Sequence, residues 1–224
     1  MWQHFYDRSP FDGFDPAAYP DDLQGWGSDD PIFETVIGFA RPRLIVEVGS
    51  WKGRSAVNMA EICRRLGFDT KILCIDTWLG NPEVLLNRTS DPEPYRSMQY
   101  RHGWPHLYFQ FLANVARRGL QDIITPLPQT SDNAAFLIRA LNLVPDIVYI
   151  DAAHEYPPVI ADLRAYYPLL RDNGVLLGDD FGYAEGVDKA VREFSFFNRI
   201  PFFGRPGKFV MVKNGDMRSI PGLK

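Results

Sequence analysis

The stretch that decides the fold reads Leu44-Ile45-Val46-Glu47-Val48-Gly49-Ser50-Trp51-Lys52-Gly53-Arg54-Ser55. Its first five residues are apolar apart from one acid, which is typical of a strand buried in a parallel sheet. A glycine follows at once, and the residues from about Arg54 to Leu66 are predicted to form an amphipathic helix. A strand, a glycine turn and a helix in this order predict an α/β fold whose ligands bind at the carboxyl ends of the strands.

The same alternation of apolar strands and amphipathic helices continues along the chain. We predict strands at 71–76, 122–127, 146–151, 174–178 and 208–213, with residues 201–203 near the partner of the last one. We predict helices at 131–141, 157–171 and 185–197. Continuous apolar strands separated by helices predict a mostly parallel sheet that helices cover on both faces.

Two segments break this alternation. Residues 1–30 are rich in Asp, Pro, Gly and aromatic residues without periodicity, so we predict an irregular N-terminal arm, followed by a helix from Pro31. The stretch 78–106 contains four prolines together with Trp and Tyr residues. A loop of this length inside a compact domain is usually functional or disordered, and its aromatic residues favour a lid over the substrate. We therefore expect one domain over 31–224 with a lid-like insertion at about 78–106.

Composition and charge narrow the class of protein. The chain has 224 residues and a net charge of −4 without a block of Lys and Arg, which argues against a nucleic-acid partner. It has no apolar stretch of the ~20 residues that a membrane helix needs, and no signal peptide at its start. We expect a cytoplasmic protein with no membrane partner, in which the aromatic arm favours a homo-oligomer. Cys63 and Cys74 are expected to be buried free thiols rather than a disulfide or a metal pair.

Residues suited to binding a nucleotide-like ligand follow the first three strands. Gly49 lets a ligand approach the backbone, and Ser55 can donate to a carboxylate held by the helix amides beyond it. The Gly-x-x-x-Gly spacing of Gly49 and Gly53 differs from that of a dinucleotide cradle, and a purely structural turn is the alternative. Asp76 can accept both hydroxyls of a ribose, or can cap a turn or helix. Ser131 is a candidate for contacting adenine and equally a helix N-cap.

These residues carry a resemblance to a known class of enzyme. The segment Glu47-Val48-Gly49-Ser50-Trp51-Lys52-Gly53-Arg54-Ser55-Ala56-Val57-Asn58-Met59-Ala60 resembles the glycine motif of class I methyltransferases, particularly the form in catechol O-methyltransferases. With Asp76-Thr77-Trp78-Leu79-Gly80 and Asp151-Ala152-Ala153-His154-Glu155-Tyr156, the pattern resembles a bacterial and phage methyltransferase family related to the macrolide-sugar O-methyltransferases. The resemblance covers roughly residues 32–213.

The resemblance implies a fold and a methyl donor. The fold is Rossmann-like, with a mostly parallel seven-stranded sheet, helices on both faces and an antiparallel last strand. The methyl donor is S-adenosylmethionine. The implied donor-binding residues are Glu47, Gly49, Ser50, Trp51, Ser55, Asp76, Thr77, Trp78, Ser131 and Asp151.

Acids end the fourth and fifth predicted strands, and neighbouring parallel strands bring such ends together. Without a cation, Asp151, Asp179 and Asp180 would repel one another and at least one pKa would rise, whereas a hard divalent ion such as Mg²⁺ would stabilise them. The resembled O-methyltransferases bind a metal at these strand ends, which implies these three acids as its ligands, although the catechol enzymes carry Asp-Asn at the last two. Adjacent strand residues face opposite sides, so a shared ion requires a turn, which Phe181 and Gly182 favour. Helix capping is the alternative.

His154 follows the fourth strand, and an ordinary pKa of ~6.5 suits it to accept a proton near neutrality. The sugar-modifying relatives use a histidine at this offset and the catechol enzymes a lysine, which implies His154 as the catalytic base; a structural histidine is the alternative. The sequence thus predicts an S-adenosylmethionine-dependent O-methyltransferase acting on a small-molecule or sugar hydroxyl.

Other classes of protein fit the sequence less well. The chain lacks the Asn/Asp-Pro-Pro-Tyr/Phe motif of amino-group methyltransferases that act on nucleic acid at the end of the fourth strand, and it lacks the phosphate fingerprint of nicotinamide oxidoreductases. A methyltransferase acting on another acceptor atom stays an alternative. So does a non-catalytic donor-binding or scaffolding subunit, which would need neither the histidine nor the three acids.

Overall fold

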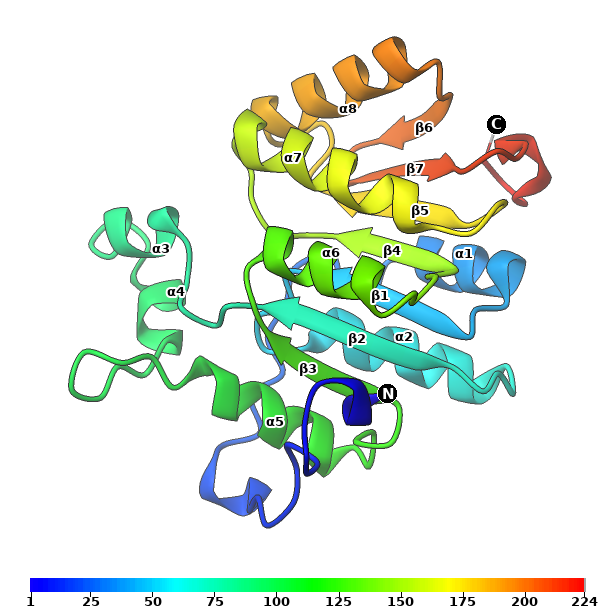
Figure 1. The fold of residues 1–224 in the computed structure, drawn as a ribbon. Helices are drawn as coiled ribbons and strands as arrows, with labels where there is room; N and C mark the ends of the chain where they lie inside the picture. Colours follow the sequence, from blue (N-terminus) through cyan, green and yellow to red (C-terminus); the bar gives the residue numbers. More distant parts are fainter. Residues whose placement is uncertain (224) are drawn as a thin grey trace.

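The computed structural model describes residues 1–223, and within them seven strands form one sheet between two layers of helices (Figure 1). The strands lie in the order β3-β2-β1-β4-β5-β7-β6. Their bounds are β1 Leu44–Val48, β2 Lys71–Asp76, β3 Ile124–Pro128, β4 Ile147–Ile150, β5 Val175–Asp179, β6 Phe202–Arg205 and β7 Lys208–Val212. Strand β7 runs antiparallel to both of its neighbours, and the other pairs are parallel. The predicted sheet, with its antiparallel last strand, is confirmed.

Helices cover both faces of this sheet. Their bounds are α1 Ile32–Ala40, α2 Arg54–Arg65, α3 Pro82–Leu86, α4 Pro92–Ser97, α5 Leu107–Arg117, α6 Ser131–Ala140, α7 Tyr156–Tyr166 and α8 Glu185–Asn198, with 3-10 turns at Trp2–His4, Pro16–Ala18, Tyr167–Leu169 and Met217–Ser219. Apolar residues of α1, α2 and α5 pack on one face, and those of α6, α7 and α8 pack on the other. Each strand alternates its side chains between these two cores, as a strand buried on both faces must.

Strand and helix boundaries differ from the sequence prediction by one or two residues at most ends. The largest difference concerns the helix predicted at 157–171, because α7 ends at Tyr166 and a 3-10 turn follows. Asp146, predicted as the first residue of the fourth strand, directly precedes β4, and its carboxylate accepts hydrogen bonds from the backbone amides of Arg43 and Leu44, at 2.7 and 2.9 Å. Both cysteines are free and buried, as predicted.

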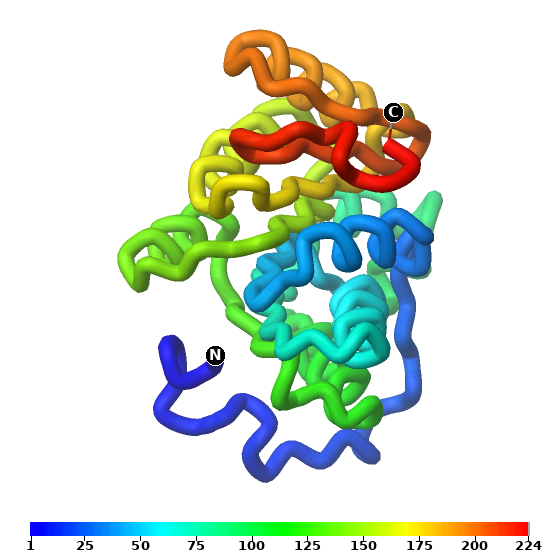
Figure 2. The backbone as a smooth tube through the Cα atoms, turned by 90° about the vertical axis from the view of Figure 1, so that its right-hand side faces the viewer, coloured from blue at the N-terminus to red at the C-terminus, as the bar shows by residue number. Residues whose placement is uncertain are grey.

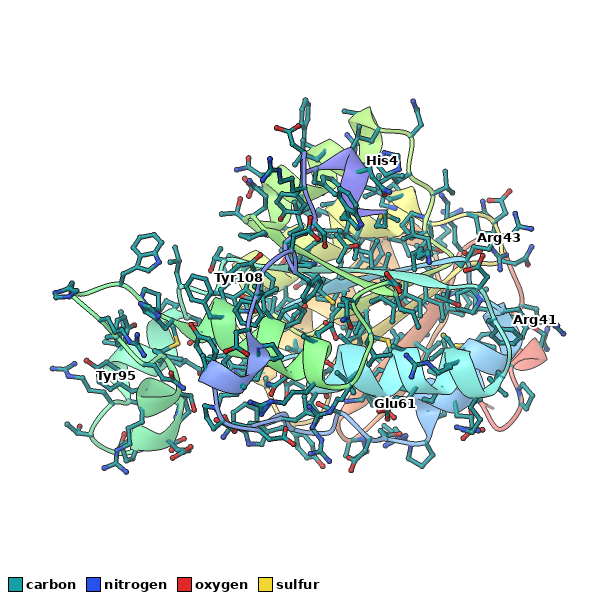
Figure 3. All side chains as sticks on the ribbon, turned by 90° about the horizontal axis from the view of Figure 1, so that it is seen from below. His4, Arg41, Arg43, Glu61, Tyr95 and Tyr108 are labelled. Carbon is teal, nitrogen blue, oxygen red and sulfur yellow. The ribbon has the colours of Figure 1, made fainter. Side chains whose placement is uncertain are left out.

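The 78–106 insertion contains helices α3 and α4 and a short bridge between Arg101 and Trp104. Figures 1 and 3 show α3 and α4, the latter marked by Tyr95, projecting beyond the carboxyl ends of the strands. Helix α5, which follows the insertion, was not predicted. Its Gln110 and Asn114 interrupt the apolar face in the sequence, yet both side chains are buried.

The N-terminal arm runs along α5 and then rises beside α2 to reach α1 (Figure 2). The two polar residues of α5 bind it directly: Gln110 donates to the carbonyl of Pro20 at 2.9 Å, and Asn114 donates to that of Asp22 at 2.9 Å. Lys52 of the β1–α2 loop forms an ion pair with the Asp22 carboxylate at 2.6 Å. The arm is therefore fixed to the loop that follows the first strand. Across residues 1–223, the helices lack the length and apolar character that crossing a membrane would demand.

The β1–α2 loop depends on close approach between two neighbouring strand ends. Gly49 has φ +87°, and a Cβ atom there would lie 1.9 Å from the carbonyl oxygen of Asp151. Its amide continues the ladder by donating to the carbonyl of Ile75 at 2.8 Å. Only a residue without a side chain satisfies both the backbone angle and this contact.

We predict that Gly49→Ala lowers the free energy of unfolding by about 3 kcal/mol or more, because left-handed strain and a backbone clash add together. The matched control is Gly67→Ala. Gly67 has φ +72°, but a Cβ atom there would meet nothing within 4 Å among the described residues. The control should lose only about 1 kcal/mol. Urea unfolding followed by circular dichroism measures both, and equal losses would contradict the close approach of Gly49 to Asp151.

Candidate active site

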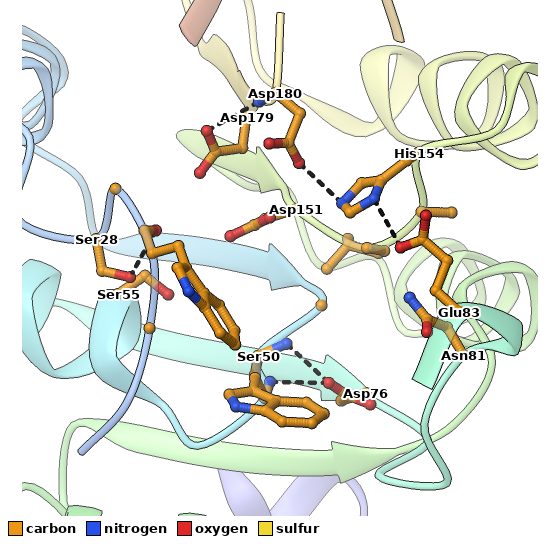
Figure 4. A pocket seen from close by; sticks show the side chains of 18 of the residues that line it. Ser28, Ser50, Ser55, Asp76, Asn81, Glu83, Asp151, His154, Asp179 and Asp180 are labelled. Atoms are coloured by element: carbon orange, nitrogen blue, oxygen red, sulfur yellow. Dashed lines mark hydrogen bonds and ion pairs between the residues drawn. The ribbon is translucent and has the colours of Figure 1, made fainter. Parts of the chain in front are cut away.

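A cavity of about 750 Å³ opens at the carboxyl ends of β1, β2, β4 and β5. Its wall comes from the loops that follow these strands, from the arm around residues 24–30, from α3 and from the turn between β6 and β7. A volume of this size suits a cofactor-sized ligand. Most of the residues that the sequence singled out line it, namely Gly49, Ser50, Trp51, Ser55, Asp76, Thr77, Ser131, Asp151, His154, Asp179 and Asp180 (Figure 4).

Glu47 lies behind the wall of the cavity rather than in it. Its carboxylate is fully buried and accepts hydrogen bonds from the hydroxyls of Ser50, at 2.6 Å, and Ser55, at 2.5 Å. Burial raises the pKa of the Glu47 carboxyl, while these two hydrogen bonds lower it. Glu47 therefore holds the two serines in place, and the hydroxyl proton of Ser55 points to Glu47 instead of serving a ligand carboxylate.

Trp78 also lies behind the wall and is only 2% exposed. Its indole nitrogen donates to the carbonyl of Trp51 at 2.7 Å, and its ring packs on Tyr108 and Phe111 with centroids 5.0 and 4.9 Å away. Trp78 thus ties the loop after β2 to the loop after β1 and supports the cavity from outside.

Asp76 connects these same two loops through its carboxylate. One oxygen accepts from the amides of Ser50 and Trp51, at 3.0 and 2.9 Å, and the other accepts from the amide of Trp78 at 2.7 Å (Figure 4). Burial raises the pKa of Asp76, while the backbone amides lower it. Three of the roughly four acceptor positions of a carboxylate are in use, which leaves room for one ribose hydroxyl rather than the two expected from the sequence.

The three acids of the fourth and fifth strand ends share one end of the cavity. Asp180 has φ +60°, so the chain turns there and both Asp179 and Asp180 face the cavity. The Tyr149 hydroxyl lies 2.9 Å from Asp151 and 2.7 Å from Asp179. Burial, followed by the charges of Asp179 and Asp180, raises the pKa of Asp151 well above its usual range.

His154 lies between two carboxylates (Figure 4). Its Nε2 is 2.9 Å from Asp180, and its Nδ1 is 3.1 Å from Glu83 on α3. The hydrogen bond to Asp180 is the main reason that the pKa of His154 is raised to about 9. This differs from the ordinary value expected from the sequence, because the sequence does not show that two carboxylates flank the ring.

Sequence reasoning missed three residues of the site, and each becomes visible only through pairing in space. Glu83 lies in the insertion, 71 positions before its partner His154 in the sequence. Lys208 opens β7, and antiparallel pairing sets it opposite Asp179, with its ammonium 2.6 Å from that carboxylate. Asp162 of α7 accepts the Ser131 hydroxyl at 2.5 Å, and burial raises the pKa of Asp162 to about 6. Of these three residues, only Lys208 gave a signal in the sequence, because it stands at the start of a predicted strand.

The acids expected to bind Mg²⁺ do not fit a divalent-ion site. Throughout residues 1–223, three or more Asp, Glu, His or Cys side chains nowhere come together in an arrangement that could hold a metal ion. One oxygen of Asp179 receives both the Lys208 ammonium and the Tyr149 hydroxyl, and Asp180 is paired with His154. The sequence correctly predicted that the three acids lie at the carboxyl ends of neighbouring strands. In the structure, basic side chains and hydrogen-bond donors of the protein already bind them.

The strand order and the cavity at the strand ends define a Rossmann-like α/β protein that binds its ligand across the sheet edge. The family described as "Methyltransferase domain" matches residues 46–181, which is more than half of the chain, and the chain belongs to this family. It is an S-adenosylmethionine-dependent methyltransferase with the class I fold.

Solved structures show the same fold at low sequence identity. Cofactor-bound Rv0187 from MTB has a TM-score of 0.60 and 14% identity, covering 89% of this chain and 86% of that chain. The calicheamicin methyltransferase CalS11 has a TM-score of 0.58 and 20% identity, covering 83% of this chain and 78% of that chain. The O-methyltransferase from Bacillus cereus, in complex with SAH, has a TM-score of 0.57 and 15% identity, covering 93% of each chain. No curated protein matches the sequence.

We predict that His154 titrates with a pKa of about 9 in an NMR pH titration. Because this value exceeds the ordinary ~6.5, the protonated ring stabilises the fold fully below about pH 6.5, and this contribution is lost as the pH rises through about 9. Asp180→Asn should lower the His154 pKa substantially, and Glu83→Gln should lower it less. An unchanged pKa in Asp180→Asn would contradict the pairing of His154 with Asp180.

Proposed function

We propose that the protein transfers the methyl group of S-adenosylmethionine to a hydroxyl of a small-molecule or sugar acceptor. The observation that carries this proposal is the position of His154, whose imidazole lies among carboxylates at one end of the cavity that also contains Gly49 and Asp76. The O-methyltransferase from Bacillus cereus, solved in complex with SAH, has the same fold. Two further sets of residues suit the two ends of such a donor. The loops after β1 and β2 suit its amino-acid and ribose parts, and Ser131 with Asp162 suits its adenine.

The donor's amino-acid and ribose parts fit the loops after β1 and β2. Gly49 has no side chain where one would fill the space beside Asp151. The first amides of α2, which begins at Arg54, form a positive helix end that attracts a carboxylate. Asp76 keeps one acceptor position for a ribose hydroxyl. When ionised, Asp151, which lines the same cavity, would attract the cationic sulfonium of the donor.

The adenine end of the donor fits the wall formed by Ser131 and Asp162. One oxygen of Asp162 accepts the Ser131 hydroxyl, and the other accepts no hydrogen bond from residues 1–223. With a pKa of about 6, Asp162 is mostly ionised at neutral pH and can accept a hydrogen bond from the exocyclic amine of adenine. Sequence reasoning assigned this contact to Ser131, whose hydroxyl proton is directed to Asp162 instead.

The chemistry requires a base for the acceptor hydroxyl. When bound, S-adenosylmethionine supplies an electrophilic methyl group, to which the acceptor oxygen bonds as the carbon–sulfur bond breaks. His154 takes the hydroxyl proton after one of its two flanking carboxylates gives way to the acceptor. At pH 7 a ring with a pKa of about 9 is neutral in about one molecule in a hundred. The neutral fraction grows with pH, and the ring is then a stronger base than an ordinary histidine.

We predict that His154→Ala lowers kcat by about 10²- to 10⁴-fold, the usual contribution of a general base, and changes the Kd for S-adenosylhomocysteine by less than about twofold. The control is His102→Ala, since His102 is exposed on the insertion and lies outside the cavity wall. Turnover is followed as S-adenosylhomocysteine released with a panel of sugar, phenol and polyketide hydroxyls. Equal losses of turnover and affinity would indicate a structural histidine, and donor binding without transfer to any hydroxyl would favour the scaffolding alternative.

We predict that Asp162→Ala weakens binding of S-adenosylhomocysteine about tenfold, equivalent to about 1.4 kcal/mol, because the adenine amine loses its acceptor. Asp132→Ala on the exposed side of α6 is the control and should bind normally. Calorimetry with the inosine analogue, which lacks the amine, identifies the contact. The wild type should prefer the adenine form, and Asp162→Ala should not. A preference that survives in the variant would contradict this role of Asp162.

A further inference from the structure

Three donors of the protein itself already bind the Asp179 carboxylate at the acceptor end. One oxygen receives the Lys208 ammonium at 2.6 Å and the Tyr149 hydroxyl at 2.7 Å. The other accepts from the backbone amide of Asp180 at 2.8 Å. A divalent ion bound to Asp179 would compete with these three hydrogen-bond donors for the oxygen lone pairs.

Lys208 is held where it cannot move aside into solvent. Its side chain is 1% exposed, and the ammonium lies 5.6 and 5.8 Å from the ring centroids of Phe33 and Tyr149. The arm closes over it, since a Cβ atom on Gly27 would lie 3.1 Å from the ammonium nitrogen. An ammonium buried in this way persists only beside a compensating carboxylate, and Asp179 is 10% exposed and supplies it.

Two of the three acids at this end of the cavity have a basic partner from the protein itself. Lys208 pairs with Asp179 and His154 pairs with Asp180, while burial raises the pKa of Asp151 and so favours its neutral form. A divalent ion arriving among these acids would meet the repulsion of a buried ammonium in a medium of low dielectric constant. Lys208 thereby reduces the repulsion between acids that Mg²⁺ would otherwise relieve.

We propose that Lys208 is a built-in counter-ion that takes the place of a divalent metal at the acceptor end, so that this methyltransferase works without Mg²⁺ or Mn²⁺. Lys208 acts here as a positioning residue: it holds the Asp179 carboxylate in place, and Asp179 in turn accepts from the Asp180 amide in the turn that presents Asp180 to His154. The consequence for methyl transfer rests on the proposed function, whereas ion binding can be measured without any substrate.

The experiment titrates Mn²⁺ into the full-length protein, freed of metal by chelation, and follows free Mn²⁺ by electron paramagnetic resonance. The wild type should show no saturable site with a Kd below ~1 mM. Lys208→Met should bind Mn²⁺ at least about tenfold more tightly, because the acids lose their counter-ion. Lys208→Arg keeps the charge and should behave as the wild type does.

The matched control is Lys213→Met, which removes a lysine just beyond the other end of β7, where its ammonium donates to the carbonyls of Pro168 and Leu170. This variant should bind no Mn²⁺. Binding of S-adenosylhomocysteine and circular dichroism report whether each variant folds. If Lys208→Met does not fold, the wild-type titration decides alone.

A saturable Mn²⁺ site in the wild type would overturn the proposal, and so would a folded Lys208→Met variant that gains no site. Methyl transfer by the wild type should stay within about twofold in 1 mM EDTA and in 1 mM MgCl₂. Loss of transfer in EDTA with recovery in MgCl₂ would also overturn it. Absence of transfer to every hydroxyl under both conditions would instead contradict the proposed function and leave the Mn²⁺ result standing.

Discussion

The close contact between Gly49 and the carbonyl of Asp151 is the constraint on which the rest of the site depends. Strands β1 and β4 are neighbours, and their loops leave the sheet with no space for a side chain between them. This contact places the β1–α2 loop, called here the donor loop, directly beside the acids of the acceptor end. A methyl donor and an acceptor hydroxyl can then meet within one cavity, and alignment of this kind is worth about 7–11 kcal/mol to a transfer reaction.

The loops around this contact are held by carboxylates rather than by apolar packing alone. Glu47 fixes Ser50 and Ser55 from below, and Asp76 fixes the backbone of the same loop from the side. The Glu47 carboxylate is withdrawn from solvent and Asp76 is half-buried in the cavity wall, so their hydrogen bonds are costly to leave unmade. The result is a rigid donor loop, which reduces the entropy that ligand binding would otherwise cost.

The acceptor end achieves the same rigidity through ion pairs. Asp179 is bound by Lys208, and Asp180 by His154, whose other nitrogen reaches Glu83 on the insertion. The insertion therefore contributes a charged group to the cavity as well as covering it, and the arm covers Lys208. This links closure of the cavity to the protonation of His154, because movement of α3 would remove one of the two carboxylates that keep the ring charged.

The resemblance to class I methyltransferases implied the antiparallel last strand, whereas the alternating pattern of apolar strands and helices determined the mostly parallel sheet and the edge at which the polar residues gather. These properties are local or follow from the rule that parallel strands end at one edge, so one sequence is enough to predict them. Helix α5 was not predicted because the polar residues Gln110 and Asn114 resemble surface residues in the sequence. They are buried because the N-terminal arm packs on them and accepts their hydrogen bonds. Only the tertiary structure decided that Glu47 and Trp78 stand behind the wall, that His154 reaches Glu83, and that Lys208 pairs with Asp179. Each of these depends on which side chains face one another across elements distant in the chain, and periodicity carries no information about such partners.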